Sequence, residues 1–499
     1  MNETLGGIDL AILISYGIIL IGMGWYFTRK TKTAEAFMVA SRSIPAWAAG
    51  LAVMSAYTSS ISYIATPGKA FDDNWHPLVF ALCIIPIAWL VTKYVIPFYR
   101  KNQTISVYKF LENRLGIWAR VYAAFAFVFF MIGRVAVILY LASLLLGSFM
   151  DFSIVYIIII LGVVTILYTL MGGMEAVIWT DVMQSVIMIV GILYCAISLS
   201  IDIFQGENSL VSQVDITGKF SLGSADFSFS SRTLWVMIIY GITENARNLI
   251  ADQNYVQKYS SVGSEKEAKN SIWLAMVIYI FLTIIFLYIG TALWIYYNGE
   301  MNALPADIVK GDQIFPYFIA TVVPVGLKGL IIAAIIAAAM STVDSALNCS
   351  ATVLHLDFYK RFFKPEMSND QEMSFLRWST VVWGVLGTLF ALAMINAKSA
   401  LDIWWQISGI FGGGILGLFL LALSKIKLSF IQGLSCVGVC ILVIIWGTFV
   451  RDLTGSLEWM NCTIDPILVG ALATFWMVAM ALVMGKLNKS KPEQVISQI

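Results

Sequence analysis

Residues 51–71 read LAVMSAYTSSISYIATPGKAF, which places hydroxyl side chains and a proline inside a stretch that is otherwise apolar enough to cross a membrane. Pro67 cannot donate a backbone hydrogen bond, and clustered hydroxyls offer the backbone other partners, so this helix is easily unwound. Unwound backbone at membrane depth is tolerated where it lines protein or water, and its carbonyls can bind ions there. The alternative is that these residues serve ordinary close helix packing. The hydroxyl residues are Ser55, Thr58, Ser59, Ser60 and Ser62.

A second interrupted stretch, residues 234–259, reads LWVMIIYGITENARNLIADQNYVQKY. A short apolar run is followed by a polar cluster, which consists of Gly241, Thr243, Glu244, Asn245, Arg247 and Asn248. If the N-terminal helix is counted as an extra, the two interrupted segments are the first and sixth helices of the remaining set. That order predicts two inverted repeats of five helices whose broken members meet at the midplane.

The composition of the whole chain predicts an all-α integral membrane protein in a lipid bilayer. Hydrophobic residues make up 59% of the 499 positions and charged residues 12%, and the mean hydropathy is +0.83. Apolar blocks of about 20 residues, the length that crosses about 30 Å of hydrocarbon, recur along the chain. We expect about 13 transmembrane helices, near 8–27, 44–64, 78–99, 121–148, 152–170, 177–201, 233–250, 271–296, 327–354, 376–395, 402–423, 429–450 and 466–485.

These segments predict a single transmembrane unit over residues 1–499. Its parts are an extra N-terminal helix (8–27), a ten-helix core (44–423), two trailing helices (429–485) and a cytoplasmic tail (486–499). Met1 to Leu5 carries Glu3 rather than a basic cluster, so no cleavable signal is expected. The net charge is +1 and no block of like charges occurs, which excludes a nucleic-acid partner. The six cysteines show no disulfide or zinc spacing.

The distribution of Lys and Arg predicts the orientation of the helices. Cytoplasmic loops are enriched in these residues. With the N-terminus outside, the loops and ends on one side carry 21 of them and those on the other side seven, and Lys93, Arg134 and Arg247 fall within helices. The bias supports an odd number of spans, with the N-terminus outside and the C-terminus in the cytoplasm. We therefore expect a multi-pass protein of the cell (inner or plasma) membrane whose oligomeric state is open.

Arg134 stands in FFMIGRVAVILYL, residues 129–141, too deep in an apolar span to reach either interface easily. A charged side chain at mid-bilayer costs about 2.5 kcal/mol or more, so one that persists usually faces a cavity and marks a pathway. Its guanidinium needs an anion. A substrate carboxylate and a structural ion pair are both open.

Two further polar features suit a hard cation. Asp181 lies in MGGMEAVIWTDVMQSVIMIVG, residues 171–191, near the inner end of a helix, where the alternative is a carboxylate exposed to cytoplasmic water. Residues 331–358, IIAAIIAAAMSTVDSALNCSATVLHLDF, supply a polar cluster after an Ala-rich run. Hydroxyl, carbonyl and carboxylate oxygens suit sodium better than a transition metal. Each hydroxyl can instead bond back to the carbonyl four residues earlier. The cluster consists of Ser341, Thr342, Asp344 and Ser345.

Other classes of protein fit the sequence poorly. An enzyme is not expected, because His76 and His355 lie at helix ends without an arrangement that suggests a triad or a metal site. A passive channel would need a continuous pore, and a sensor would need an attached signalling domain. Neither feature is visible in the sequence.

Together, LYTLMGGMEAVIWTDVMQ at 167–184 and AAAMSTVDSALN at 337–348 resemble the sodium/solute symporter family over most of the chain. The resemblance implies a LeuT-type inverted-repeat fold and sodium-coupled symport by alternating access. It implies a conserved sodium site formed by backbone oxygens near Ser55 and Thr58 with Ala338, together with the hydroxyls of Ser341 and Thr342. A second sodium site, present in some members, would use Asp181, Ser341 and Ser345. Asp344 stands where a hydroxyl residue is common, and it could join that site, titrate or point elsewhere.

The stretch IGRVAVILYL at 132–141 looks most like the sialic acid branch of that family. This resemblance implies that Arg134 receives the carboxylate of sialic acid (N-acetylneuraminate), in line with the bidentate geometry of guanidinium. Ser59, Ser60 and Ser62 would then contact hydroxyls of the sugar, with Asn245 or Asn248 on the opposite broken helix. Pro77 and Ala81 stand where that branch offers an aromatic and an amide side chain. Another acid sugar or a monocarboxylate would also satisfy Arg134.

Overall fold

The computed structural model describes residues 5–102, 105–149, 152–205, 209–298, 304–305, 308, 311–396, 400–424, 426 and 428–489. Helices account for most of these residues, and they are α1 Gly7–Thr28, α2 Ala34–Val39, α3 Ala46–Tyr57, α4 Ser60–Asp72, α5 Pro77–Leu82, α6 Ile84–Leu90, α7 Ile96–Asn102, α8 Lys109–Leu115, α9 Ile117–Phe149, α10 Ile154–Phe204, α11 Leu210–Gln213, α12 Leu234–Ala246, α13 Gln253–Ser260, α14 Glu265–Asn298, α15 Gly311–Thr321, α16 Leu327–Val353, α17 Asn369–Ala393, α18 Ala400–Leu423, α19 Phe430–Phe449 and α20 Val469–Lys489. Residues 490–499 of the predicted tail lie outside this part of the chain.

All thirteen predicted spans fall on helical residues. Within the described ranges, nine segments are long and apolar enough to cross a bilayer without interruption. The other four predicted spans are not counted among these nine segments, for three reasons. α10 carries two of the predicted spans, α3 and α4 form one broken span, and α12 and α18 are too short or incompletely described to qualify. The structure therefore agrees with the predicted all-helical, multi-span architecture, and the number of thirteen spans stays a prediction.

A glycine divides α10 into two spans. At about 1.5 Å per residue, a straight helix of its 51 residues would be more than twice as long as the hydrocarbon layer is thick. Gly173 has φ 56° and ψ −150°, a conformation that favours glycine, and the chain bends there. A Cβ atom at this position would lie 2.8 Å from the Cα of Phe37, so the close approach also needs glycine.

Both predicted broken helices are broken. α3 ends at Tyr57 and α4 begins at Ser60, and between them Thr58 (ψ 89°) and Ser59 (ψ 172°) have non-helical backbones. In the second stretch, α12 continues into a π-helical turn, η3 Arg247–Ala251, and the break falls at Asp252, with φ −96° and ψ 117°. It therefore comes after the polar cluster that suggested it.

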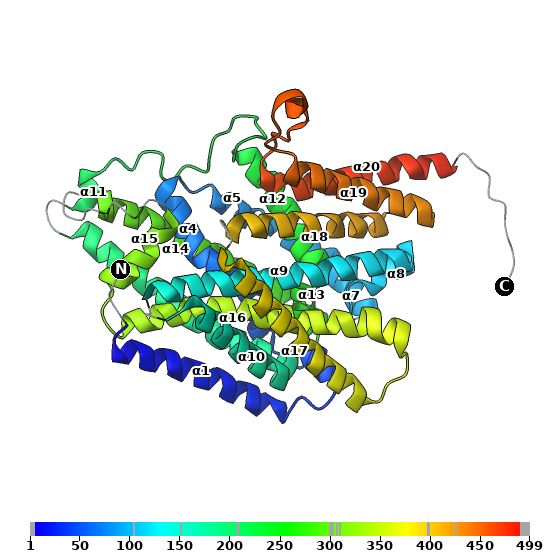
Figure 1. Cartoon of the computed structure of the whole chain (residues 1–499), viewed down its shortest axis with the longest axis horizontal. Coiled ribbons are helices and arrows are strands. Elements are labelled where there is room, and N and C mark those ends of the chain that lie inside the picture. Colours follow the sequence, from blue (N-terminus) through cyan, green and yellow to red (C-terminus); the bar gives the residue numbers. More distant parts are fainter. Residues whose placement is uncertain are drawn as a thin grey trace.

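The broken helices lie inside the bundle. α3 packs against α14 and α10, and α16 contacts α3, α4, α9, α10 and α13. Figure 1 shows α1 along one edge of the molecule and α19 and α20 along the opposite edge, with α9, α13 and α16 between them.

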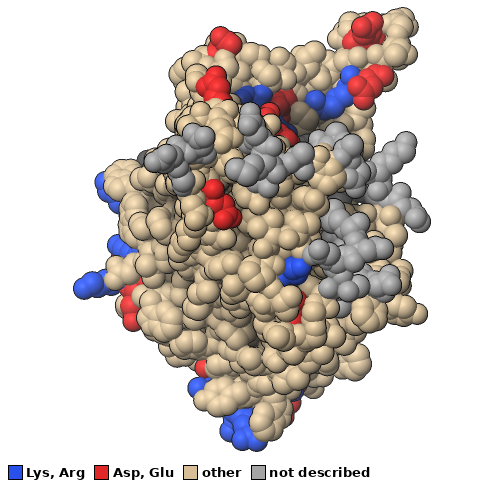
Figure 2. Space-filling model, turned by 90° about the vertical axis from the view of Figure 1, so that its left-hand side faces the viewer, with Lys and Arg blue, Asp and Glu red and all other residues tan. Residues whose placement is uncertain are grey.

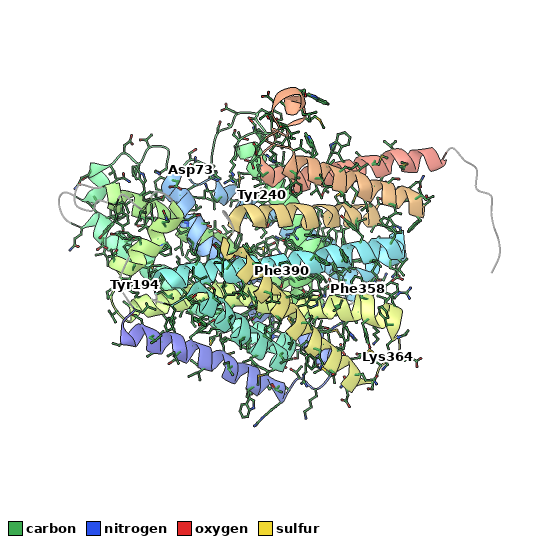
Figure 3. The ribbon with its side chains drawn as sticks, viewed as in Figure 1. Asp73, Tyr194, Tyr240, Phe358, Lys364 and Phe390 are labelled. Carbon is green, nitrogen blue, oxygen red and sulfur yellow. The ribbon has the colours of Figure 1, made fainter. Side chains whose placement is uncertain are left out.

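The two ends of the bundle can be told apart by labelled residues. Figure 3 shows Asp73, at the end of α4, and Lys364, after the π-helical η4 Leu354–Phe363, toward opposite ends of the molecule. In Figure 2 the face nearest Asp73 carries scattered charged side chains among uncharged ones. We refer below to the Asp73 end and the Lys364 end.

Candidate substrate and ion sites

Arg134 lies in the middle of α9 and is 8% exposed. Its Nη2 donates a hydrogen bond of 3.0 Å to the carbonyl of Ala56, next to the break between α3 and α4. No carboxylate oxygen of the described residues lies within 4.0 Å of this guanidinium. Of the two alternatives left open by the sequence, a direct structural ion pair is therefore not formed within the described residues.

A cavity of about 190 Å³ separates the two broken helices beside Arg134. The predicted residues Ser59, Ser62, Arg134 and Asn248 line it, and so do Ala56, Tyr57, Phe80, Phe130, Ile138, Tyr240, Glu244, Arg247, Tyr255 and Tyr279. Hydroxyls, an amide, aromatic faces and charged groups thus surround one space, which suits a polar solute with a ring or an apolar face.

Two predicted substrate residues do not line this cavity. Ser60 is buried in the first turn of α4, and no described residue forms a hydrogen bond with its hydroxyl. Asn245 is also buried, and its amide nitrogen donates to the carbonyls of Phe80 (3.1 Å) and Gly241 (2.7 Å). The bond to Phe80 ties α12 to α5, and the bond to Gly241 lies within α12, so the structure gives Asn245 a packing role in this state.

A second cavity, of about 260 Å³, adjoins the first toward the Asp73 end. Ser62, Phe80, Tyr240 and Tyr279 line both cavities, and Figure 3 labels Tyr240. Lys69, His76, Pro77 and Arg232 belong to the outer one. Burial lowers the pKa of His76 to about 4, and the nearby cations Arg232 and Lys69 act in the same direction. The imidazole is therefore neutral at pH 7.

Arg247 is a second arginine of the inner cavity, and the sequence analysis gave it no role. Its guanidinium contacts both carboxylate oxygens of Glu244, at 2.5 and 3.0 Å, and one of Asp252, at 3.1 Å. It also lies over the ring of Phe130, 4.9 Å from the centroid. Arg247 therefore makes the direct contacts with both carboxylates, and Asp252 is also close enough to interact with the charge of Arg134.

The predicted conserved sodium ligands lie on α3, α16 and the break between α3 and α4. The hydroxyls of Ser341 and Thr342 both donate to the carbonyl of Ala338, each at 3.2 Å. The bond of Thr342 is the back-bond to the carbonyl four residues earlier that the sequence left open as an alternative, whereas Ser341 bonds to a carbonyl three residues earlier. Both bonds bring three predicted ligands to one place. Ser55 is fully buried, and its hydroxyl has no hydrogen-bond partner in the part of the chain that the structure describes. Oxygen ligands of this kind fit sodium.

The four residues predicted for a second sodium site are fully buried. Asp181 accepts a hydrogen bond of 2.8 Å from the ammonium of Lys258, which also donates to the carbonyl of Ala52 at 3.0 Å. The alternative of a solvent-exposed Asp181 is therefore wrong. Lys258 itself was assigned to a cytoplasmic loop by the Lys and Arg distribution, whereas the structure buries it on α13.

Asp344 faces α10 and accepts a hydrogen bond of 2.8 Å from the hydroxyl of Tyr168. Ser345 lies 3.2 Å from its other carboxylate oxygen and donates to the carbonyl of Ser341 at 2.8 Å. Asp344 is also close enough to Asp181 and Lys258 to interact with both charges. The structure thus gathers two carboxylates, one ammonium and several hydroxyls into one buried cluster, which consists of Tyr168, Thr180, Asp181, Lys258, Ser341, Asp344 and Ser345.

The broken helices, the buried arginine and the oxygen-lined cluster are features of a secondary transporter. A model of the sodium:solute symporter family matches residues 37–429, and the chain belongs to this family. It is a transporter and not an enzyme, as the sequence predicted.

Two bacterial relatives are similar over nearly the whole chain. The sodium/sialic acid symporter SiaT of Proteus mirabilis is 33% identical over 443 residues, which is 88% of this chain and 88% of SiaT. The sodium/sialic acid symporter NanT of Aliivibrio fischeri is 31% identical over 473 residues, 94% of this chain and 93% of NanT.

Solved structures agree in fold. A substrate-bound, outward-open sodium-coupled sialic acid symporter has a TM-score of 0.88 and 30% identity, covering 98% of this chain and all of that one. Mhp1, a nucleobase-cation symporter, has a TM-score of 0.51 at 16% identity, covers 91% of this chain and 96% of its own, and shows the fold alone. The predicted inverted-repeat fold is confirmed.

Proposed function

We propose that this protein is a sodium-coupled symporter that imports sialic acid, with Arg134 as the receptor for the substrate carboxylate. The observation that carries this proposal is a buried guanidinium beside a cavity between two broken helices, without a carboxylate of the described residues in direct contact. The names of the relatives SiaT and NanT support the choice of sialic acid. The transport core comprises residues 44–423.

Polar groups around the cavity fit the rest of the sugar. Ser59 and Ser62 on the first broken helix and Asn248 on the second face the same space as Arg134 and can bond its hydroxyls. Ser60 and Asn245 would join only after a movement of α4 or α12. Pro77 lines the outer cavity, and Ala81 is buried. The alternative substrate is another acid sugar or a monocarboxylate, which Arg134 would bind in the same way.

Charge balance explains why sodium would accompany the anion. Arg134 and Arg247 offset Glu244 and Asp252, so the described charged groups around the inner cavity sum to zero. A bound carboxylate adds one negative charge at low dielectric, where an unbalanced charge is costly. Sodium at Ser55, Thr58, Ala338, Ser341 and Thr342 would restore neutrality next to the break that Arg134 contacts through Ala56. Asp181, Ser341, Asp344 and Ser345 are the candidate ligands for a second sodium ion.

The two cavities fit a state in which the substrate site is accessible from one end of the bundle only, which is one half of an alternating-access cycle. The inner cavity continues into the outer one at the Asp73 end. At the Lys364 end, Arg120 joins α9 to η4 and α8 through Asp357 and Glu112 at 2.6 and 2.5 Å. We place the Asp73 end outside and the Lys364 end in the cytoplasm, with the N-terminus outside.

The number of sodium ions decides the driving force. Two sodium ions with one monoanion carry one net charge inward, worth about 2.3 kcal/mol per 100 mV. Two tenfold sodium gradients add roughly 2 × 1.4 kcal/mol. Together these sustain an accumulation of a few thousandfold, whereas coupling to one sodium ion would be electroneutral.

Uptake of labelled sialic acid into proteoliposomes, with and without an inward sodium gradient, tests the proposal. We expect sodium-driven accumulation that Arg134→Ala abolishes, whereas Arg377→Ala, which removes an arginine of α17 outside the cavity lining, retains it. Sodium-independent uptake, or unchanged affinity in Arg134→Ala, would contradict the proposal. Competition with unlabelled monocarboxylates separates the alternative substrates, and sodium-dependent counterflow separates a carrier from a channel.

A further inference from the structure

A third cavity lies at the surface, far from the substrate path. Its volume is about 480 Å³, and it opens where the end of α1, the segment before α3 and the part of α10 just after Gly173 meet. Lys30 and Glu175 line it together with the aromatic residues Tyr26, Phe27 and Trp179. The transport mechanism gives this cavity no role.

Its two charged groups are opposite in sign and loosely paired. The ammonium of Lys30 lies 3.9 Å from a carboxylate oxygen of Glu175, which is longer than a hydrogen bond. The side chain of Lys30 is 50% exposed and that of Glu175 is 16% exposed. A loose pair of this kind adds little stability by itself. It leaves a cation and an anion side by side, both able to bind a ligand that carries the two complementary charges.

The surroundings place this cavity at the edge of the bilayer. Trp25, Tyr26 and Trp47 are about half exposed, and aromatic side chains of this kind concentrate at the membrane interface. Arg29 lies over the ring of Trp25, 4.4 Å from its centroid, and Trp47 makes an edge contact with Trp179 at 5.6 Å. A lipid head group is the molecule that meets such a surface, rather than a solute from bulk water.

We propose that this cavity binds the head group of phosphatidylethanolamine. The ammonium of Lys30 lies over the rings of Tyr26 and Phe27, 5.0 and 5.5 Å from their centroids. The phosphate lies against Lys30, and the primary ammonium of the lipid donates hydrogen bonds to Glu175. Phosphatidylcholine has the same net charge but no N–H donor, and phosphatidylglycerol lacks the cation. The site therefore discriminates among lipids by both charge and hydrogen bonding.

The lipid would add to the contacts among three segments at this corner, where the hydroxyl of Thr31 already donates a hydrogen bond of 2.9 Å to the carbonyl of Gly172 on α10. Residues 40–42, just before the cavity, all have positive φ angles of 48–56°, a conformation that non-glycine residues adopt at a cost. Ile44, which lines the cavity, donates a backbone hydrogen bond of 3.1 Å to Ser261 at the end of α13. A bound head group would hold α1 and α10 against this junction.

Thermal unfolding of the delipidated protein in detergent, titrated with short-chain phospholipids, tests this proposal without any transport. We expect a saturable rise in the midpoint with phosphatidylethanolamine, and at least about tenfold weaker apparent binding of phosphatidylcholine and phosphatidylglycerol, equal to the loss of one charge-assisted contact. This comparison uses the wild-type chain, so it does not depend on whether a variant folds.

Matched variants then locate the site. Lys30→Gln and Glu175→Gln should each weaken phosphatidylethanolamine binding about tenfold, whereas Lys32→Gln, which removes an exposed lysine two residues away that does not line the cavity, should leave it unchanged. Equal stabilisation by all three lipids, or equal effects of Lys30→Gln and Lys32→Gln, would overturn the proposal. Equal binding of phosphatidylglycerol and phosphatidylethanolamine would show a phosphate site without the ammonium contact and would also overturn it.

Discussion

Removal of the ammonium of Lys258 should destabilise the protein severely. Lys258 and Asp181 are both fully buried and lie 2.8 Å apart. Among the described residues, the other carboxylate oxygen of Asp181 has no hydrogen-bond partner, so Lys258→Met leaves this carboxylate without a described polar contact. Methionine retains most of the apolar stem. Breaking a buried pair by removing one partner costs about 3–5 kcal/mol, because the remaining charge is uncompensated.

Denaturant unfolding of the purified protein in detergent measures this cost. Lys269→Met is the matched control, because Lys269 pairs with Glu265 at 2.6 Å and both side chains are more than one-third exposed. We expect the control to lose about 0.2–1 kcal/mol. Asp181→Asn in the Lys258→Met background should recover most of the loss, because a neutral pair leaves no buried charge.

Sodium provides a second readout. In Lys258→Met the carboxylate of Asp181 becomes available to a cation, so NaCl should stabilise this variant more than the wild type, measured against KCl at equal ionic strength. Two results would contradict this prediction. Lys258→Met would lower the free energy of unfolding by no more than Lys269→Met does, or the double variant would lose as much unfolding free energy as the two single variants added together.

Three further predictions concern other positions. If Asp181 belongs to a second sodium site, Asp181→Ala should lower the sodium Hill coefficient of uptake from about two to about one, and a coefficient that stays near two excludes Asp181 from the site. Gly173→Ala should destabilise the protein by about 1–3 kcal/mol in denaturant unfolding, because φ is 56° and the added Cβ meets Phe37; a neutral effect would contradict the tight bend. Burial lowers the pKa of His76 from its ordinary value of 6.5 to about 4 in the folded state. As the pH drops, the unfolded chain therefore binds a proton before the folded protein does. The free energy of unfolding should fall as the pH drops from 6.5 toward 4. At pH 5 this loss of unfolding free energy should amount to about 1–2 kcal/mol, and His76→Gln should remove it. If the unfolding free energies of the two proteins change with pH in parallel, His76 does not have the lowered pKa.

Most of the fold follows from local sequence features. Apolar blocks located the predicted spans, each of which lies mainly on helical residues, because the bilayer imposes one length on every helix. The pair Gly172–Gly173 falls in the predicted gap between two spans, where the bend of α10 is found. The breaks were predicted from polar residues, but the second one lies at Asp252, after the polar cluster. Polar side chains show that a helix is interrupted, and the backbone angles that place the break depend on tertiary contacts.

The lining of the cavity was predicted only in part, for the same reason. Arg134 could be identified because a charge at mid-bilayer needs a cavity or a partner. Ser59 and Ser62 line the cavity and Ser60 does not. In a continuous helix the spacing of residues fixes which ones share a face. At the break, the non-helical backbone angles of Thr58 and Ser59 change the direction in which the following side chains point. The sequence alone therefore could not predict which of these three serines face the cavity.

The charged groups show which contacts a sequence can reveal. Arg247 and Glu244 are three residues apart on one helix, a spacing that brings side chains together, so their ion pair was accessible to sequence reasoning. That pair indicates a neutralised Arg247, in line with the proposal that Arg134 receives the substrate carboxylate. Lys258 and Asp181 are 77 residues apart, and their contact depends on how α13 packs against α10 and α3. The Lys and Arg distribution describes loops on average and cannot recognise a lysine that folds inward, so the contact between Lys258 and Asp181 could be found only from the structure.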